Sequence, residues 1–399
     1  MSVEERLLQI DPGATIFGQN GQTRIGRTRV ISDSLSNKTT GGNITTAVSD
    51  VFEQLKVRIV ADALEMLTGP IDLPTVIDNI NKNDESLRAI NDYLRWFSLS
   101  IRFSNLRPTE GTAQFELLEN DAAVRFDELS SGQRSIVNIA ATLAFSRESG
   151  GVVLIDEIEN HLHPTMQIRL REAIMSNLSS RVQVIAVTHS PAMMDEKNLA
   201  ATHRVAIEDG FSKIRSCASL KDDKTTVRML FASTNGGAIF FANSVLLVEG
   251  QSDGMFFRTY NKDLYPTSEL LIYETTSSSK IAPTVDVLKK LGIKYIAVTD
   301  LDYAAKIPRP IIKSMNGKTK DLVRSDFSAK DIVKIDKRRK KLTINKIFVL
   351  SEGTIESYTH TSTSKKTGSM LDFVTKKDWS QITNKDEIDK YMASANEAA

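Results

Sequence analysis

The chain has 399 residues, of which 41% are apolar and 25% are charged, and its formal net charge is +1. This length allows two domains, each with a core of its own. The near-neutral charge excludes a protein that binds nucleic acid through its total charge, so a DNA-binding surface requires local segregation of basic residues. The single cysteine, Cys217, excludes a disulfide framework and a cysteine-based zinc site. No apolar run approaches the roughly 18 residues that cross a bilayer, and we expect a cytoplasmic protein with no membrane partner.

The first half of the chain passes from loops into alternating strands and helices. Residues 13–47 are rich in Gly, Thr, Ser and Asn and predict short strands and loops. Hydrophobic spacing predicts helices at 48–66, 84–97 and 133–147, with strands within 99–126. A strand–helix–strand series follows at 152–155, 165–178 and 182–187. Such a series indicates a parallel sheet, and a strand at 203–207 is expected to close this domain.

The second half repeats this order. Its expected elements are strand 245–248, helix 253–261, strand 270–273, helix 282–291 and strand 294–299. Between the two series, residues 219–243 are polar at first and then contain glycines, which favours a linker. We therefore predict an α/β protein with two domains, 1–218 and 244–399, each containing a parallel sheet.

A turn that can bind phosphate precedes the first series. Leu-Ser-Ser-Gly-Gln at 129–133 leads directly into a helix, whose first amides and dipole favour an anion. The candidate nucleotide-binding residues in this turn are Ser130, Ser131, Gly132 and Gln133. Taken alone, the pattern is also an ordinary turn before a helix.

Polar side chains also follow two strands of the first domain. Asp156 and Glu157 come directly after strand 152–155, and His189 follows the next strand. Open parallel sheets bind ligands at the carboxyl ends of their strands. Asp156 is placed to hold magnesium through water, Glu157 to orient or deprotonate an attacking water, and His189 to contact a terminal phosphate. The structural alternative is that Asp-Glu caps a helix.

The order of these motifs resembles that of the ABC-type ATPases: signature, Walker B, switch histidine. The stretch 154–164 is similar to the branch related to DNA-repair and phage-defence ATPases. The resemblance implies ATP binding and a homodimer, in which the signature of one subunit closes over ATP held by the other.

The phosphate-gripping loop of that family, Gly-x-x-x-x-Gly-Lys-Ser/Thr, is missing from the sequence. The glycine-rich segment 18–22 has no following Lys-Ser/Thr, and the Gly-Lys-Thr at 317–319 has Ile312 in place of the first glycine. We expect that the family's first strand and loop are absent through truncation or loss. ATP hydrolysis is then expected to be impaired, or to depend on a partner that supplies the loop.

Acidic residues follow the strands of the second domain. Glu249 comes directly after strand 245–248, with Asp253 four residues later, and strand 294–299 ends in Asp300 and Asp302. Alternation in extended backbone would put Asp300 and Asp302 on one face. Clustered carboxylates repel each other unless cations occupy the site, and oxygen ligands suit Mg²⁺ or Mn²⁺. Such ions support phosphodiester cleavage. Each motif alone is also typical of a turn or a cap.

The second set resembles the Toprim domain, which has Glu-Gly-x-x-Asp followed by Asp-x-Asp. The segment 351–358 then resembles the later acidic element of the nuclease branch, where Glu352 and Glu356 would extend the metal site. A basic residue beyond it would neutralise the transition state, and Lys365 or Lys366 is the candidate. An ABC-type ATPase followed by Toprim is the arrangement of the OLD (overcoming lysogenization defect) family nucleases, which include effectors of Gabija and some retron defence systems. The resemblance covers roughly residues 100–360.

A basic stretch extends from Lys313 to Lys346, with Lys337–Lys341 at its centre and few aromatic residues. This composition fits contact with a phosphate backbone, and the alternative is a solvated hairpin. The leading hypothesis is a Mg²⁺- or Mn²⁺-dependent DNA endonuclease in phage defence or DNA repair. The alternative is a catalytically impaired regulatory or scaffold subunit that works with a protein partner in a defence complex.

Overall fold

The computed structural model describes residues 8–10, 14–17, 63, 65–66, 72–107, 112–178, 180–208, 210–233, 236–305, 322–362 and 366–398. The chain divides into two compact units, Met1–Met193 and Met194–Ala399. The motif expectations for 18–22 and 317–319, and the candidate Lys365, lie outside the described residues. Within the ranges given above, no helix is both long enough and apolar enough to span a bilayer.

The first unit contains a mixed sheet and an antiparallel sheet. The mixed sheet has the order β1 (Leu8–Ile10), β2 (Ala14–Phe17), β6 (Gly151–Ile155) and β7 (Val182–Ala186). β6 and β7 are parallel, with Val153 opposite Val184, and α6 (Pro164–Asn177) connects them as the strand–helix–strand pattern predicts. The antiparallel sheet consists of β3 (Leu99–Arg107), β4 (Thr112–Glu119) and β5 (Ala122–Val124).

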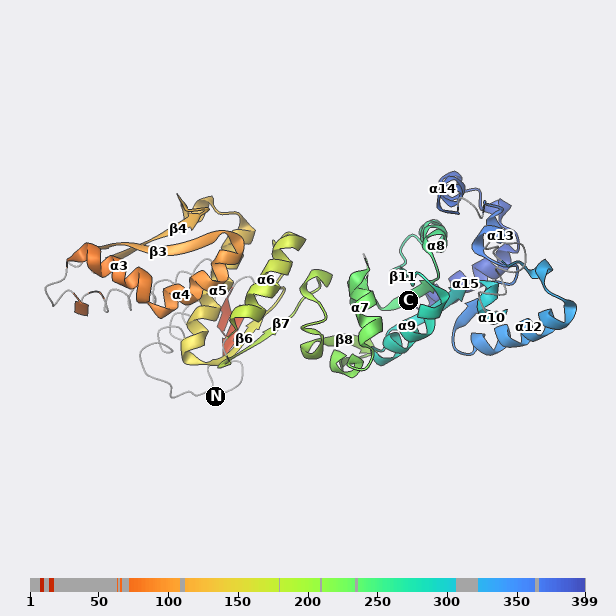
Figure 1. Cartoon of the computed structure of the whole chain (residues 1–399), viewed down its shortest axis with the longest axis horizontal. Helices are drawn as coiled ribbons and strands as arrows, with labels where there is room; N and C mark the ends of the chain where they lie inside the picture. The colour runs from red at the N-terminus through yellow and green to blue at the C-terminus, as the bar shows by residue number, and fades with distance from the viewer. Residues whose placement is uncertain are drawn as a thin grey trace. The chain divides into compact units, whose positions relative to one another are not determined.

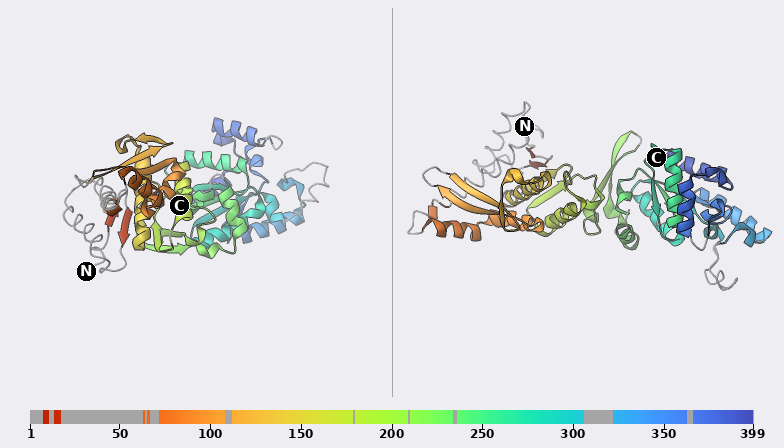
Figure 2. Two further views of the ribbon diagram at one scale, coloured as in Figure 1. Left: turned by 60° about the vertical axis from the view of Figure 1, so that its left-hand side comes forward. Right: turned by 90° about the horizontal axis from the view of Figure 1, so that it is seen from above.

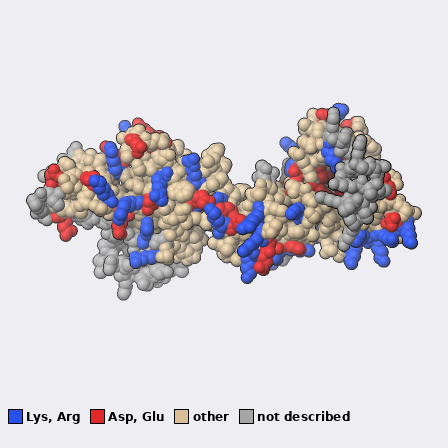
Figure 3. All heavy atoms as spheres, viewed as in Figure 1, with Lys and Arg blue, Asp and Glu red and all other residues tan. Residues whose placement is uncertain are grey.

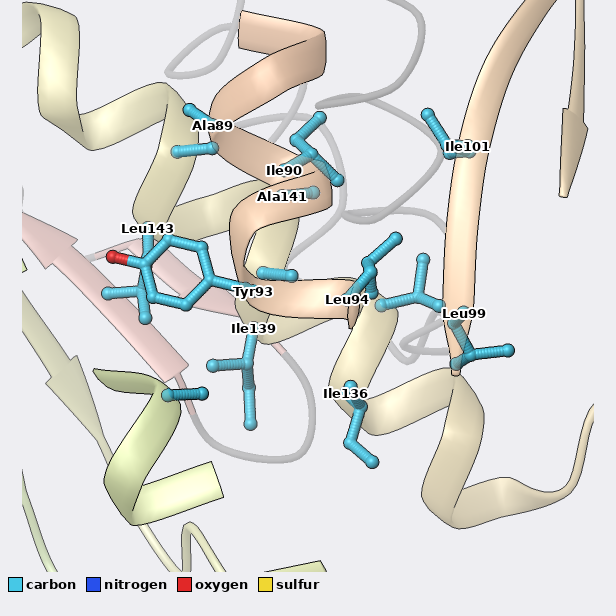
Figure 4. Packing of buried hydrophobic residues seen from close by; sticks show 14 of the residues in the cluster. Ala89, Ile90, Tyr93, Leu94, Leu99, Ile101, Ile136, Ile139, Ala141 and Leu143 are labelled. Carbon is cyan, nitrogen blue, oxygen red and sulfur yellow. The ribbon is translucent and has the colours of Figure 1, made fainter. Parts of the chain in front are cut away.

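Besides α6, three helices contribute to the core of this unit. They are α3 (Leu73–Asn83), α4 (Glu85–Leu94) and α5 (Ser131–Ser149). Asp72 and Asp84 cap α3 and α4 by accepting backbone amides. Figure 4 shows Leu94 of α4, Leu99 of β3 and Ile136 of α5 packed together, and all three are buried. The apolar periodicity of α4 and α5 therefore faces this shared core.

The second unit is built on a fully parallel sheet, as the strand–helix order predicts. Its order is β11 (Leu271–Glu274), β10 (Ser244–Val248), β12 (Lys294–Thr299) and β13 (Ile347–Val349). Every residue of β10 is buried. Leu246 and Val248 belong to one core cluster and Val245 and Leu247 to another, because alternate side chains of a strand face opposite sides of the sheet.

Helices cover both faces of this sheet. One face packs against α8 (Gln251–Leu264), α14 (Lys366–Lys376) and α15 (Lys385–Ala398), which contribute Phe256, Phe373 and Ile388. The other face packs against α7 (Lys224–Ala232) and α9 (Ser278–Lys290), which contribute Leu230 and Val285. α14 lies beside α8 in the views of Figures 1 and 2. The expected α/β class is therefore confirmed.

Residues 219–243, expected to be a linker, are folded instead. They include α7 and the 3-10 segment Gly236–Phe241. Ile239 and Phe240 share a core cluster with Val245 and Leu247, because apolar side chains in this segment cover one face of the sheet. The strand expected at 203–207 to close the first domain is β8 (His203–Glu208), which pairs with β9 (Phe211–Ser216) and falls within the second compact unit.

Cys217 also lies in this second core. Its side chain is 0% exposed. Burial raises the pKa of its thiol to about 11. The thiol is thus a small apolar group of the core.

Candidate active site

The first unit places the three residues predicted to contact magnesium and phosphate at the ends of neighbouring strands. Asp156 and Glu157 directly follow β6, and His189 follows β7. The two loops meet, since the Val187 amide donates to the Ile155 carbonyl at 2.8 Å and the Ile158 amide donates to the Val187 carbonyl at 3.2 Å. Asp156, Glu157 and His189 are all exposed. This is the carboxyl edge of a parallel pair, where a nucleotide phosphate can approach.

A carboxylate that sequence reasoning missed fixes this edge. Glu159 Oε1 accepts the backbone amide of His189 at 2.6 Å. Glu157 has a φ of 48°, and its Oε2 accepts from the Asn160 side chain at 3.2 Å. A left-handed backbone at a residue other than glycine costs about 1–3 kcal/mol and often occurs at functional sites. The signal that could have identified Glu159 is a third acid soon after Asp156-Glu157.

The predicted signature residues form a helix cap. Ser130 accepts the Gln133 amide at 3.2 Å, and the Gln133 side chain accepts the Ser130 amide at 3.0 Å, which makes a capping box at the start of α5. Gly132 is required by packing, because a Cβ there would lie 2.7 Å from the His161 carbonyl oxygen. Ser130 and Ser131 are exposed, and the capping Ser130 hydroxyl retains its proton for donation to an anion.

The second unit gathers acidic side chains at the carboxyl ends of β10 and β12. Glu249 follows β10 and Asp300 follows β12, and the Asp300 amide donates to Glu249 Oε1 at 3.0 Å. Asp253 lies in the first turn of α8, where its Oδ2 accepts the Gly250 amide at 3.0 Å. Glu249, Asp253 and Asp300 are each partly exposed, so the edge is open to a ligand.

Asp302 does not lie in extended backbone as expected. It occupies the first turn of the short helix α10 (Leu301–Ala305), which begins directly after Asp300. Leu301 is buried, and its amide donates to the Gly353 carbonyl at 2.9 Å, so the chain turns into a helix at this point. Asp302 still lies close enough for its charge to raise the pKa of Glu249 and of Asp300.

The third strand end, after β13, adds two further acids. Glu352 lies in the loop 351–354, and Glu356 is buried in α13 (Ile355–Thr359). The charge of Glu356 raises the pKa of Asp253 and of Asp300. Six predicted acids thus lie on or beside one edge of the sheet, and the charges of at least five of them interact: Glu249, Asp253, Asp300, Asp302 and Glu356.

Burial and mutual repulsion raise the pKa values of the carboxyl groups at this edge of the sheet. Burial, and then Asp302, raises the pKa of Glu249 to about 8. Burial, and then Glu356, raises the pKa of Asp253 to about 7. Burial and the neighbouring carboxylates raise the pKa of Asp300 well above its ordinary value. The positive charge of Lys366, at the start of α14, lowers the pKa of Glu249 and of Asp253.

The donor set fits a hard divalent cation. Carboxylate oxygens are the ligands that Mg²⁺ and Mn²⁺ prefer, and a cation would relieve the repulsion between them. Among the residues that the structure describes, no group of three acidic, histidine or cysteine side chains is arranged to hold one ion. Binding would therefore require side chains such as Glu249 and Asp302 to rotate toward a shared ion.

Two family models match the two units. An AAA domain model, described as a putative AbiEii toxin of a Type IV TA system, matches residues 52–195. A TOPRIM domain model of overcoming lysogenization defect protein-like proteins matches residues 240–302. The chain joins an AAA/ABC-type ATPase domain to an OLD-like TOPRIM domain. The second model ends at Asp302, so the matched part of the TOPRIM domain contains Glu249, Asp253, Asp300 and Asp302.

Several curated proteins are similar to parts of the chain. The Old nuclease of Escherichia phage P2 is 25% identical over 258 residues, covering 58% of this chain and 44% of the relative. The Septu protein PtuA of Bacillus thuringiensis is 30% identical over 123 residues, covering 28% and 30%. The retron Ec83 probable ATPase of Escherichia coli is 27% identical over 131 residues, covering 29% and 24%. The chain spans less than half the length of each of these relatives.

Solved structures of SMC head domains also match. The SMC head domain from Thermotoga maritima is 20% identical with a TM-score of 0.27, and the match covers 35% of this chain and 50% of that one.

A buried polar network supports the loop 351–354 of the TOPRIM domain, and sequence reasoning missed its centre. Glu387 of α15 accepts hydrogen bonds from the hydroxyls of Tyr358 and Tyr391 and from Ser351 Oγ. Its Oε1 also pairs with Arg339 at 2.5 Å. Burial raises the pKa of Glu387, but these partners outweigh burial and hold the pKa below its ordinary value.

The same network reaches the acidic edge. Ser351 Oγ also lies 3.0 Å from Glu352 Oε1, and Asn384 donates to Ser351 Oγ at 3.1 Å. The loop that carries Glu352 is therefore held by residues of α13 and α15. Glu387 is 29 to 48 residues away from Tyr358, Ser351 and Arg339 in the chain, so no local motif indicates it.

Proposed function

We propose that this chain is a metal-dependent DNA endonuclease that cleaves phosphodiester bonds at the carboxyl edge of its TOPRIM sheet. The observation that carries the proposal is the convergence of Glu249, Asp253 and Asp300, with Asp302 and Glu356 close by, at neighbouring strand ends. The similarity to the Old nuclease and to the OLD-like TOPRIM model supports it. The chain spans only part of that nuclease, so the activity of the whole relative is transferred here as a proposal.

The roles of the residues follow from their positions. Bound Mg²⁺ or Mn²⁺ would supply an activated water and charge neutralisation for the leaving oxygen. Glu249 and Asp300 would hold the ion, because both project from strand ends and are linked by the Asp300 amide. Asp302 and Glu356 would complete the set of ligands. Lys366 would stabilise negative charge on the phosphate, since its charge already acts on Glu249 and Asp253.

We propose that the ATPase domain binds ATP at the edge formed by Asp156, Glu157 and His189 and dimerises through the Ser130 turn. Hydrolysis would depend on a phosphate loop supplied by a partner, because the sequence contains no Gly-x-x-x-x-Gly-Lys-Ser/Thr. Defence against phage is the setting that we propose, given the similarity to Septu and retron proteins.

Plasmid cleavage in the presence of Mg²⁺ or Mn²⁺ tests the nuclease proposal. We expect Asp300→Ala to lower the rate by about 1000-fold, since a lost metal ligand removes several kcal/mol of transition-state stabilisation. Asp286→Ala on α9 is the matched control, because Asp286 is exposed and belongs to the middle of a helix. Cleavage that survives Asp300→Ala at the wild-type rate would remove the site assignment.

The second candidate is a regulatory subunit without nuclease activity. It is favoured by one observation, that no three of the described side chains are arranged to hold one metal ion. Calorimetric titration with Mn²⁺ separates the two candidates. Binding that Asp300→Ala abolishes supports the nuclease, whereas no binding together with no cleavage supports the regulatory subunit.

A further inference from the structure

The helix α12 (Ala329–Thr343) separates its basic residues into two groups. It contains seven Lys and Arg residues and two Asp residues, and it is helical where a hairpin was the alternative. The two arginines are used inside the fold: Arg338 donates to the Ala304 carbonyl at 2.9 Å, and Arg339 donates to the Val349 carbonyl at 2.8 Å. These bonds fix α12 to α10 and β13.

The two acidic residues of α12 also have partners, Asp336 among the arginines and Asp331 in the first turn of the helix. Asp336 forms a bidentate pair with Arg324, at 2.6 and 3.1 Å, and also contacts Arg339. Asp331 accepts from the Ser328 hydroxyl at 2.6 Å and lies 3.5 Å from Lys334. Within the part of the chain that the structure describes, the outer lysines of the helix have one acidic partner, Asp331 beside Lys334.

The outer side forms what we call the lysine face: Lys330, Lys334, Lys337 and Lys341. At 100° per residue these four lie within an arc of about 60°. All four are exposed, and Lys340 is exposed beside them. Figure 3 shows basic side chains gathered over α12 at the lower right of the view. The inward arginines hold the helix, so the lysine face is presented on a fixed support.

The lysine face leads toward the acidic edge. Just before α12, the Arg324 amide donates to the Glu352 carbonyl at 3.1 Å. Arg339 contacts Val349 at the carboxyl end of β13, and residues 344–346 connect the helix to the amino end of the same strand. α12 therefore runs beside β13, from the acidic edge of the sheet to the opposite edge.

A pocket continues the positive surface at that opposite edge. Its volume is about 320 Å³, and it contains three exposed lysines, Lys289, Lys294 and Lys346, with no acidic residue in its lining. The ring of Tyr295 lies under Lys289, at 5.9 Å from the ammonium to the ring centroid. Ile344 and Asn345, directly after α12, line the same pocket.

We infer that the lysine face and this pocket bind the phosphate backbone of duplex DNA and direct it to the acidic edge. From Lys330 to Lys341 the face runs about 16 Å, at ~1.5 Å per residue. One strand of a duplex has a phosphate every ~3.4 Å along the duplex axis and winds around it, so a face of this length can contact a few phosphates. Lysine acts as a point charge and reads no base edge, so the binding is independent of sequence.

The exposed apolar residues in α12 and directly after it do not favour a protein partner. Val333 and Ile344 are 69% and 81% exposed. They lie about 16 Å apart along the helix axis, with lysines between them, and so do not form the contiguous apolar centre of a protein interface. The inference rests on the proposed DNA substrate, but it concerns binding and can be measured without cleavage.

The test measures the affinity for a short fluorescein-labelled duplex by anisotropy, with EDTA present, between about 50 and 200 mM salt. Each neutralised phosphate contributes about 0.9 to the slope of log K against log salt. We expect Lys337→Gln/Lys341→Gln to lower this slope by about 2 and to weaken binding equally for unrelated sequences. The matched control is Lys376→Gln/Lys390→Gln, two exposed lysines on α14 and α15, which should retain the wild-type slope.

Three outcomes separate this inference from the proposed function. A wild-type slope in the α12 variant, or an equal loss in the control, would overturn the inference. DNA binding with the expected loss of slope, in a protein that never cleaves, would uphold the inference and remove the nuclease. Lys289→Gln/Lys346→Gln tests the pocket, and an unchanged slope there would limit the DNA contact to α12. These lysines are exposed, so the unfolding midpoint of each variant should match the wild type.

Discussion

The two units place acidic residues at the same topological position, the carboxyl ends of parallel strands, and give them opposite environments. Asp156 and Glu157 in the ATPase domain are exposed. Glu249 and Asp300 in the TOPRIM domain are partly buried, and burial is the first cause of their raised pKa values. The order of the strands therefore decides where a site lies. The helices that cover the sheet decide how far the acidic residues are buried and so how far their pKa values are raised.

The two strand ends are buried to different extents because different elements surround them. β10 has helices on both sides, and α10 and α13 place Asp302 and Glu356 beside its carboxyl end. β7 is the last strand in the order of its sheet. Ile185 in this strand is 47% exposed, and Val187 directly after it is 49% exposed. The TOPRIM edge can thus concentrate charge that a cation neutralises, whereas the ATPase edge is open to a large ligand such as ATP.

The largest effect should come from the support of the TOPRIM edge. We expect Glu387→Ala to lower the free energy of unfolding by about 3–5 kcal/mol, because it removes the closer of two carboxylate partners of the mostly buried Arg339 and the acceptor of two tyrosine hydroxyls. Glu387→Gln keeps the shape and should cost less, about 1–3 kcal/mol. Urea unfolding measures both, with the exposed Glu397→Ala as control. A loss below about 1 kcal/mol in Glu387→Ala would show that the network is not a support.

The next largest effect is the pH dependence of stability, which should differ between the acidic residues of the two sheets. The folded pKa values of about 8 for Glu249 and about 7 for Asp253 exceed the ordinary values of 4.5 and 3.8. The folded state therefore holds protons that the unfolded state releases, so stability falls as pH rises from the unfolded pKa values near 4 to the folded values near 7 and 8. We expect the metal-free protein to lose several kcal/mol of stability between roughly pH 4 and 8, and added Mn²⁺ to restore it.

A matched pair of substitutions sharpens this prediction. Asp300→Asn removes a charge from the repelling cluster, so it should raise the melting temperature of the metal-free protein at pH 8.5 and flatten its pH dependence. Asp156→Asn removes an exposed charge and should change stability by no more than about 0.5 kcal/mol. Equal responses of the two variants would contradict the contrast between the edges.

The smallest effect concerns the Ser130 turn and separates its two roles. Ser130→Ala removes the cap of α5 and should cost about 1 kcal/mol, whereas Ser130→Asn keeps a capping side chain and should cost a few tenths. Thermal unfolding checks the stability, and light scattering with and without ATP checks dimerisation. If both variants lose ATP-dependent dimers, the serine contributes more than a cap. If Ser130→Asn dimerises as the wild type does, the turn is structural only.

The parts of the fold that local patterns encode were predictable. Apolar strands followed directly by acids, as at Glu249 and Asp300, identify buried parallel strands and the edge where ligands bind. The conformation of Asp302 was not predictable in this way, because α10 begins where Leu301 is buried and its amide bonds to Gly353, more than fifty residues later.

Other features depend on partners that are distant in the chain. Residues 219–243 looked like a linker because their polar start hides the spacing of Val227 and Leu230, which pack against β10. Glu387 lies in a polar segment, and only the folded chain brings it to Tyr358 and Arg339. The segregation of α12 into inner arginines and outer lysines likewise needs the three-dimensional neighbours.

The buried Cys217 has a practical consequence for experiments on this molecule. A thiol that is 0% exposed, with a pKa of about 11, reacts poorly with maleimides at neutral pH. Cysteines introduced on the surface of each unit can therefore carry a donor and an acceptor fluorophore without removal of the native residue. Energy transfer between the two dyes would then report whether nucleotide or DNA changes the separation of the ATPase and TOPRIM domains.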